Sequence, residues 1–396
     1  MKSQDHRESG MSRRRMLSLL GQSGAALAAS AGAIVSARAD GVERNDGAPL
    51  TPTLTTRLTH EYGVRFPFVG AGMGFVSYPP LAAAVSNAGG IGVLGNAVEP
   101  PPSTQILIQM IKSMTPNLFG VDFIDDISAF GPITTQDHIN VCIQEGVRLV
   151  IFHQAVPHKS FVDALKGAQI KIWFQAPSVE RAVAAVELGV DAIIAQGKQA
   201  GGHCRSTTRT IKLLHEIIEA VSPVMVLASG GIATGADVVE ALANGAEGVW
   251  VGTRLVASNE AYAHDNYKQR LLQAAGHATA VTTAFGPEWP NQPYRVLRTA
   301  LVDQVAGHEE QIPPPSPSDP PIGHTLLFPF TFKVPYDMPK FSAVVPTPDT
   351  SGQFDQMGFP AGEDSVKKIK NIKPAAEIVA EMMQEAARII QEDLST

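Results

Sequence analysis

Between Phe66 and Leu255 the chain alternates short apolar, β-rich runs with segments of helical spacing, and this alternation constrains the fold most strongly. Eight such runs occur, at residues 66–71, 92–94, 119–123, 149–152, 171–175, 192–195, 224–229 and 248–251. Helical spacing fills intervals between them, as at residues 81–88, 104–114, 135–145, 179–188, 211–220 and 236–244. Nearly continuous apolar strands that alternate with helices indicate a parallel sheet covered by helices. Eight units predict an α/β protein with a closed (β/α)8 TIM barrel.

The fold alternative is an open, doubly wound sheet that binds a dinucleotide. Such a sheet usually carries the pattern G-x-G-x-x-G directly after its first strand. Here the first run is followed by Gly70-Ala71-Gly72-Met73-Gly74, which lacks the third glycine at that spacing. The motif therefore favours the barrel.

After the eight units the composition changes, and we predict a C-terminal loop-rich and helical extension over residues 306–396. Six prolines between His308 and Gly323 predict a stiff, extended excursion. Residues 341–362 are rich in Pro, Gly and Thr and are expected to form loop, whereas residues 363–394 return to helical spacing. We expect this last segment to pack on the barrel, which itself would occupy residues 40–305.

The first 39 residues differ from the rest of the chain. Arg13-Arg14 precede a mild stretch rich in Ala, Gly and Ser, which ends at Ala37-Arg38-Ala39, a small-x-small pattern typical of cleavage before Asp40. The segment resembles a twin-arginine export signal, so we expect a periplasmic protein that contacts the membrane only through this signal. The alternatives are a disordered basic tail and an uncleaved anchor. The net charge of −7, without a long basic stripe, argues against nucleic acid as a partner.

Glycines follow each of the last two predicted strands. Ser229-Gly230-Gly231 comes after the seventh run and Gly252-Thr253 after the eighth. In (β/α)8 barrels a phosphate site commonly forms at these two loops, because glycines let backbone N–H groups approach the anion. A single glycine more often marks only a turn, but glycines in both of these loops together predict a phosphate site.

A histidine follows the sixth run, in the loop Gln196-Gly197-Lys198-Gln199-Ala200-Gly201-Gly202-His203. The loops after the strands carry the active site of such barrels, and imidazole is the natural proton acceptor near neutral pH. A lone histidine is more often a surface or core residue, but this position favours a catalytic role for His203.

Three ordered motifs resemble the signatures of the nitronate monooxygenase family, formerly called 2-nitropropane dioxygenases. They are the segment from Pro67 to Gly74 with the following Leu81–Gly92 block, the segment from Asp191 to His203, and the segment from Ala228 to Ala233 joined by Gly248–Arg254. The resemblance covers about residues 55–260. It implies a non-covalently bound FMN and a flavin-dependent oxidation of alkyl nitronates, and of nitroalkanes, by O2 to a carbonyl compound and nitrite.

The resemblance also implies roles for individual residues. His203 would remove the α-proton of a nitroalkane or position the nitronate. The expected FMN-binding residues are Ala71, Gly72, Met73, Gly74, Asp122, Gln175, Gln196, Gly201, Gly202, Gly230, Gly231, Gly252 and Thr253; no metal is expected. The departures from the family pattern include Gly72 in place of a proline, Asp122 in place of a frequent asparagine, and Gln175 in place of a lysine of some relatives. Loss of that lysine would remove a cation that stabilises the anionic reduced flavin.

Two other functions stay open at this point. A flavin-dependent enoyl reductase that uses NAD(P)H shares the barrel and the Gly-Gly-His motif, although an export signal argues against cytoplasmic acyl-carrier substrates. A non-catalytic flavin-binding protein is the second alternative, and the position of His203 after the sixth predicted strand argues against it. The oligomeric state and the physiological substrate do not follow from the sequence.

Overall fold

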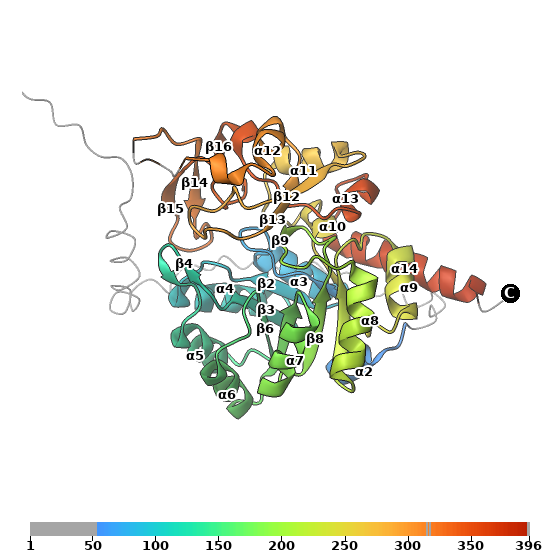
Figure 1. Cartoon of the computed structure of the whole chain (residues 1–396). Helices are drawn as coiled ribbons and strands as arrows, with labels where there is room; N and C mark the ends of the chain where they lie inside the picture. The colour runs from blue at the N-terminus through green and yellow to red at the C-terminus, as the bar shows by residue number, and fades with distance from the viewer. Residues whose placement is uncertain (1–53, 314–315, 317, 394–396) are drawn as a thin grey trace, which may run out of the picture.

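The computed structural model describes residues 54–313, 316 and 318–393, and a barrel of eight parallel strands forms its centre (Figure 1). The order around the sheet is β1-β11-β10-β8-β7-β6-β3-β2, and a parallel bridge between Val69 and Ile91 brings β1 next to β2. The strands are β1 (Phe68–Gly70), β2 (Gly92–Gly95), β3 (Phe119–Ile124), β6 (Leu149–His153), β7 (Lys171–Ala176), β8 (Ala192–Gln196), β10 (Met225–Ser229) and β11 (Val249–Val251). The predicted (β/α)8 barrel is confirmed, and the doubly wound alternative is wrong because this sheet closes.

Helices surround the barrel and follow the strands in the predicted alternation. They are α3 (Pro79–Asn87), α4 (Pro101–Met114), α5 (Gln136–Gln144), α6 (Lys159–Gly167), α7 (Val179–Leu188), α8 (Thr210–Val221), α9 (Gly235–Ala243) and the short α10 (Thr253–Val256). Local signals set their ends: the Ser178 hydroxyl accepts a hydrogen bond from the Arg181 N–H at the start of α7, and Gly189, with φ of 92°, ends it.

The alternation of side chains along each strand produces two apolar layers. In β6, Leu149 and Ile151 face the barrel interior, whereas Val150 and Phe152 join the layer between sheet and helices. Trp173 fills the interior, and its indole N–H donates to the Tyr62 hydroxyl (2.7 Å). Tyr62 belongs to α2 (Arg57–Tyr62), so this helix packs against the inner layer. The barrel is therefore a packed core, and binding is restricted to the ends of the strands.

The elements from α11 to η2 lie over one end of the barrel (Figure 1). They include α11 (Asp265–Gln273), α12 (Ala300–Val305) and the one-turn helices η1 (Glu309–Gln311) and η2 (Phe354–Gln356). Two small sheets, β12-β13-β9 and β15-β14-β16, were not predicted from the sequence. Their strands are β9 (Gly202–His203), β12 (Thr279–Thr282), β13 (Tyr294–Leu297), β14 (Gly323–Leu327), β15 (Val334–Met338) and β16 (Ser351–Gly352); β4 (Ile127–Ser128) and β5 (Gly131–Pro132) form a separate hairpin.

The C-terminal segment contains two helices, α13 (Ser365–Lys368) and α14 (Ala375–Asp393). α14 lies along α9 (Figure 1), and a Cβ atom at Gly235 would approach the Met382 carbonyl oxygen to 2.5 Å. The Gly235 N–H donates to the Glu385 carboxylate (2.6 Å). The domain boundary at residue 305 stays a prediction.

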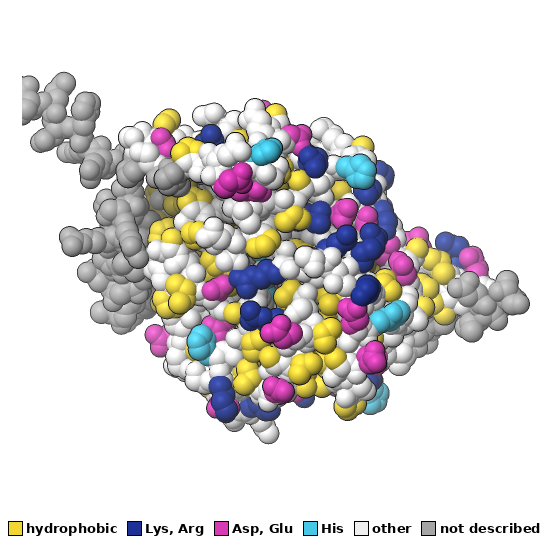
Figure 2. Space-filling model, viewed as in Figure 1, with side chains coloured by type: hydrophobic (Ala, Val, Ile, Leu, Met, Phe, Trp, Pro, Cys, Tyr) yellow, Lys and Arg dark blue, Asp and Glu magenta, His cyan; other side chains and the backbone are white. Residues whose placement is uncertain are grey.

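The predicted export signal lies outside the described residues. Within the part that the structure describes, no helix has both the length and the apolar character that crossing a membrane requires. On the face shown in Figure 2, Lys and Arg side chains lie among Asp and Glu rather than in one continuous basic stripe.

Candidate active site

A cavity of about 450 Å³ opens at the carboxyl ends of the barrel strands, beneath the C-terminal elements. Its volume falls within the range of about 300–1,000 Å³ that is usual for cofactor and substrate sites. His203 and all the predicted FMN-binding residues except Asp122 line it. Residues up to about 180 positions apart in the sequence therefore line one cavity, as the predicted barrel requires.

The glycine loops after β10 and β11 form one end of this cavity. Gly230 and Gly231 have φ values of 111° and 85°, a left-handed conformation that glycine adopts without strain. A Cβ atom at Gly230 would lie 2.9 Å from the Ala200 backbone nitrogen. The loop therefore presents backbone rather than side chain, which is the arrangement that a phosphate needs.

A segment of the C-terminal extension completes this end, and the sequence analysis missed it. The Gly362 N–H donates to the Thr253 hydroxyl oxygen (3.0 Å), and Ser365 lines the cavity beside the glycine loops. A Cβ atom at Gly201 would approach the Ala361 carbonyl carbon to 2.5 Å. Since the Thr253 hydroxyl accepts from Gly362, its own proton remains available for an anion.

The first loop and β3 form another part of the wall. A Cβ atom at Gly72 would lie 2.4 Å from the Asp122 Cβ, so only glycine lets this loop pass over Asp122. Asp122 is buried beneath the loop and does not line the cavity; its Oδ1 atom lies 3.2 Å from the His153 Nδ1 atom. Burial raises the pKa of the Asp122 carboxyl, and His153 acts in the opposite direction.

His203 lies on β9, which pairs with β13 so that His203 is opposite Tyr294. Its ring stacks on Tyr294 (centroids 4.4 Å apart) and meets Trp289 edge-on (4.6 Å). The amides of Gln154 and Gln196 donate to its carbonyl oxygen (3.2 and 3.3 Å). The backbone of His203 is therefore held by Gln154 and Gln196 at the ends of barrel strands, and its ring is held by Trp289 and Tyr294.

The surroundings of His203 keep its imidazole neutral. Its Nδ1 atom is buried and has no hydrogen-bond partner in the described part of the chain. Burial, together with the nearby His153 and Arg205, lowers the pKa of His203 to about 3. At neutral pH the side chain is thus an uncharged proton acceptor.

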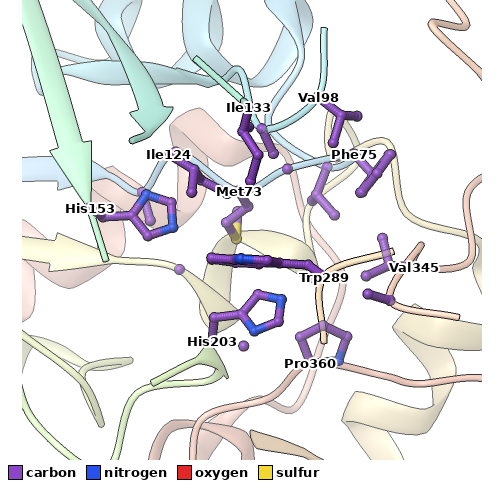
Figure 3. Close-up of a pocket in the computed structure, with 18 of the residues that line it drawn as sticks. Met73, Phe75, Val98, Ile124, Ile133, His153, His203, Trp289, Val345 and Pro360 are labelled. Carbon is purple, nitrogen blue, oxygen red and sulfur yellow. The ribbon is translucent and has the colours of Figure 1, made fainter. Parts of the chain in front are cut away.

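Three further residues beside His203 were not predicted: His153, Trp289 and Tyr294, all of which line the cavity. Figure 3 shows His153 and His203 on different sides of the cavity, with Met73 and Trp289 close to them. His153 ends β6, so the rule that predicted His203 could also have found it. Trp289 and Tyr294 come from a segment without a clear strand or loop signal.

The residues present fit FMN. No Lys or Arg lines the cavity within the described ranges, so an anion there would be held by backbone N–H groups and hydroxyls. The left-handed glycines, Thr253 and Ser365 supply such groups at one end, and the amides of Gln175 and Gln196 lie at the ends of neighbouring strands. Among the described residues no group of three or more His, Cys, Asp or Glu side chains could hold a metal ion.

The family model of nitronate monooxygenases matches residues 55–385, which is most of the chain. The chain belongs to the nitronate monooxygenase family. This assignment makes it a flavin-dependent oxidoreductase, and the match includes the extension that covers the cavity.

The chain is also similar to several individual relatives and solved structures. A probable nitronate monooxygenase of Staphylococcus aureus is 29% identical over 65% of this chain and 82% of its own length. A (3aS,4S,5R,7aS)-5-hydroxy-7a-methyl-1-oxo-octahydro-1H-indene-4-carboxyl-CoA dehydrogenase of Mycobacterium tuberculosis is 34% identical over 64% of this chain and 68% of its own. The structure of FabK from Thermotoga maritima is similar with a TM-score of 0.70 and 29% identity, covering 87% of this chain and 99% of that one. A nitroalkane oxidase of Streptomyces ansochromogenes shares the fold (TM-score 0.68, 23% identity, 85% and 99% covered).

Proposed function

We propose that the protein binds FMN and oxidises alkyl nitronates with O2 to a carbonyl compound and nitrite. The observation that carries this proposal is the neutral imidazole of His203 in the same cavity as the glycine loops. An uncharged acceptor beside a nitro group can remove a proton from carbon or hold the nitronate that results. The family assignment supports the same chemistry.

In this proposal, different residues of the cavity bind the cofactor phosphate and handle the substrate proton. Gly230, Gly231, Thr253 and Ser365 would hold the FMN phosphate, and bound FMN would supply the electron acceptor and the route of electrons to oxygen. His203 would take or orient the substrate proton at one ring nitrogen. Tyr294 and Trp289 hold that ring in place and help to exclude water from it.

The second candidate is an NAD(P)H-dependent enoyl reductase. The likeness to FabK, which spans 99% of that chain, favours it. The two candidates differ in electron donor, because a nitronate oxidase takes electrons from its substrate, whereas a reductase takes them from a nicotinamide.

We expect purified protein to be yellow, with one non-covalent FMN per chain, because the cavity presents a backbone cradle for one phosphate. Flavin content is measured from the absorbance spectrum after denaturation and chromatography. Folded but colourless protein that takes up no added FMN would exclude this cofactor.

The two candidate functions separate under anaerobic conditions. The proposed function requires a nitronate to bleach the flavin absorbance, and reoxidation in air to release nitrite. Bleaching by NADH or NADPH, followed by reoxidation with an enoyl thioester and not with a nitronate, would instead establish the reductase.

We also propose that Arg13 and Arg14 form an export address, with a mature chain that begins near Asp40 in the periplasm. Twin-arginine export carries folded proteins, which suits a protein that acquires its flavin in the cytoplasm. Replacing both arginines by Lys is expected to leave the protein in the cytoplasm with its signal attached, as fractionation and N-terminal sequencing would show. Unchanged periplasmic yield would contradict the proposal.

A further inference from the structure

The proposed substrate is an anion, yet the cavity lining contains no Lys or Arg among the described residues. Its acidic groups and histidines are Glu99, Asp137, Glu288, His138, His153 and His203. The backbone N–H groups and hydroxyls at the glycine loops are assigned to the FMN phosphate, so a second anion elsewhere in the cavity requires a counter-charge or a charged hydrogen-bond donor, since burying an unpaired charge is costly. Only the three histidines can provide one.

His138 is already fully engaged by the backbone. Its Nδ1 atom accepts from the Thr135 N–H (3.1 Å), and its Nε2 atom donates to the Glu99 carbonyl oxygen (2.8 Å). This pair of bonds selects the neutral tautomer and leaves neither nitrogen for a ligand. Burial also lowers the pKa of His138.

His203 does not provide the charge either. Its ring is enclosed by two aromatic side chains, and Arg205 lies close enough to disfavour a proton on it. The low pKa that follows suits a base and excludes a resident cation at neutral pH.

His153 differs from both because one of its nitrogens faces a carboxylate. The Nδ1–Oδ1 contact with Asp122 measures 3.2 Å, and the side chain of Asp122 is only 2% exposed. A carboxylate accepts, so Nδ1 carries a proton and Nε2 is the nitrogen left for the cavity. Nε2 makes no hydrogen bond within the described residues, and Figure 3 shows the His153 ring among the side chains that line the cavity.

The groups around His153 come from four elements. Asp122 lies on β3, the neutral Gln175 is its strand neighbour on β7, and Met73 belongs to the first loop. His203 on β9 is close enough to interact electrostatically with His153 and with Arg205, which forms an ion pair with Asp126 (3.0 Å). Within the described residues, Asp122 is the one carboxylate at ion-pair distance from the His153 imidazole.

We infer that His153, held by Asp122, is the anion-binding residue of the cavity: its protonated Nε2 donates to a nitronate oxygen. The inference rests on the proposed function for its substrate class. Asp122 fixes the ring through its contact with Nδ1, and the Nε2–H bond to the anionic substrate is charge-assisted. His153 also lies beside Gln175, the position at which some relatives carry a cation, so the positive charge is supplied from the neighbouring strand.

Nitrate, an unreactive anion with the same O–N–O geometry, tests this on the flavin-loaded protein. Its dissociation constant is measured by calorimetry and by the change in flavin absorbance at neutral pH. His153→Gln should weaken binding roughly 10- to 100-fold, the value of a charged hydrogen bond. Asp122→Asn should weaken binding as well, because the imidazole loses the carboxylate that holds its Nδ1 atom.

His158→Gln is the matched control. His158 also pairs with a buried aspartate, since its Nδ1 atom lies 2.7 Å from Asp125 Oδ2, but it is exposed and does not line the cavity. Its replacement is expected to leave nitrate binding unchanged. Unaltered nitrate affinity in His153→Gln, with normal flavin content, would overturn the inference.

The test of the anion site and the test of the proposed function can fail independently. Nitrate binding through His153 in a protein that does not oxidise nitronates would support the anion site and exclude the proposed reaction. Nitronate oxidation by a protein whose nitrate binding does not depend on His153 would support the proposed reaction and exclude His153 as the anion site.

Discussion

Replacing His203 by Asn is expected to lower kcat/KM for neutral nitroalkanes by about 10²–10⁴-fold, the usual contribution of a general base. The carbon acid must lose its proton before oxidation, and His203 is the only lining histidine that is held neutral with its ring free of hydrogen bonds to side chains of the described residues. Nitronates prepared in advance need no proton removed, so their kcat/KM should fall much less. Flavin content should stay near that of the wild type, because the phosphate loops lie elsewhere.

His215→Asn provides a control, because His215 is an exposed histidine on α8. The pH profile adds a second measure. Because the pKa of His203 lies near 3, its base form is present throughout neutral pH, and no ionisation of this residue should appear between about pH 5 and pH 9. Equal losses on nitroalkanes and nitronates, with intact FMN, would remove His203 from the role of base and leave it that of orienting the nitronate.

The same low pKa bears on the choice of substrate. A base is most effective when its pKa is close to the working pH, and an imidazole with a pKa near 3 is a weak acceptor for a carbon-bound proton. Turnover of neutral nitroalkanes by the wild type is therefore expected to be much slower than that of nitronates. This favours the nitronate over the neutral nitroalkane as the substrate form, in agreement with His153 as the anion-binding residue.

The barrel could be predicted because its signal is local and repeated. Each strand is a nearly continuous apolar run, and the observed strands begin and end within about two residues of the predicted ones. The end of the barrel that carries the site follows from the same order, since all parallel strands end at one side. Gly230, Gly252 and His203 could thus be placed together without knowledge of their contacts.

The rest of the site depends on contacts between distant parts of the chain. β9 consists of only two residues, and its partner β13 lies about ninety positions later, so the local pattern carries no trace of their pairing. Gly362 and Ser365 meet the glycine loops across more than one hundred positions. The sequence shows that Asp122 departs from the asparagine frequent in the family. Its burial beneath Gly72 and its contact with His153 depend on how the barrel packs and could not be predicted.

Gly252→Leu is expected to weaken FMN binding by about 100-fold or more while leaving the fold intact. At this position the backbone is not left-handed, and a Cβ atom would lie 3.5 Å from the Ala71 Cβ and 3.6 Å from the Met73 sulfur, so the first added carbon causes no clash. The rest of a leucine side chain must then occupy the cavity between the eighth-strand loop and the first loop. The same substitution at Gly230 would be less informative, because its φ of 111° would strain any side chain. Gly167→Leu, at an exposed position with nothing within 4 Å, is the matched control and should retain flavin. FMN affinity is measured by fluorescence quenching, and melting temperature reports on the fold. Full flavin retention in Gly252→Leu, at unchanged melting temperature, would place the phosphate outside these loops.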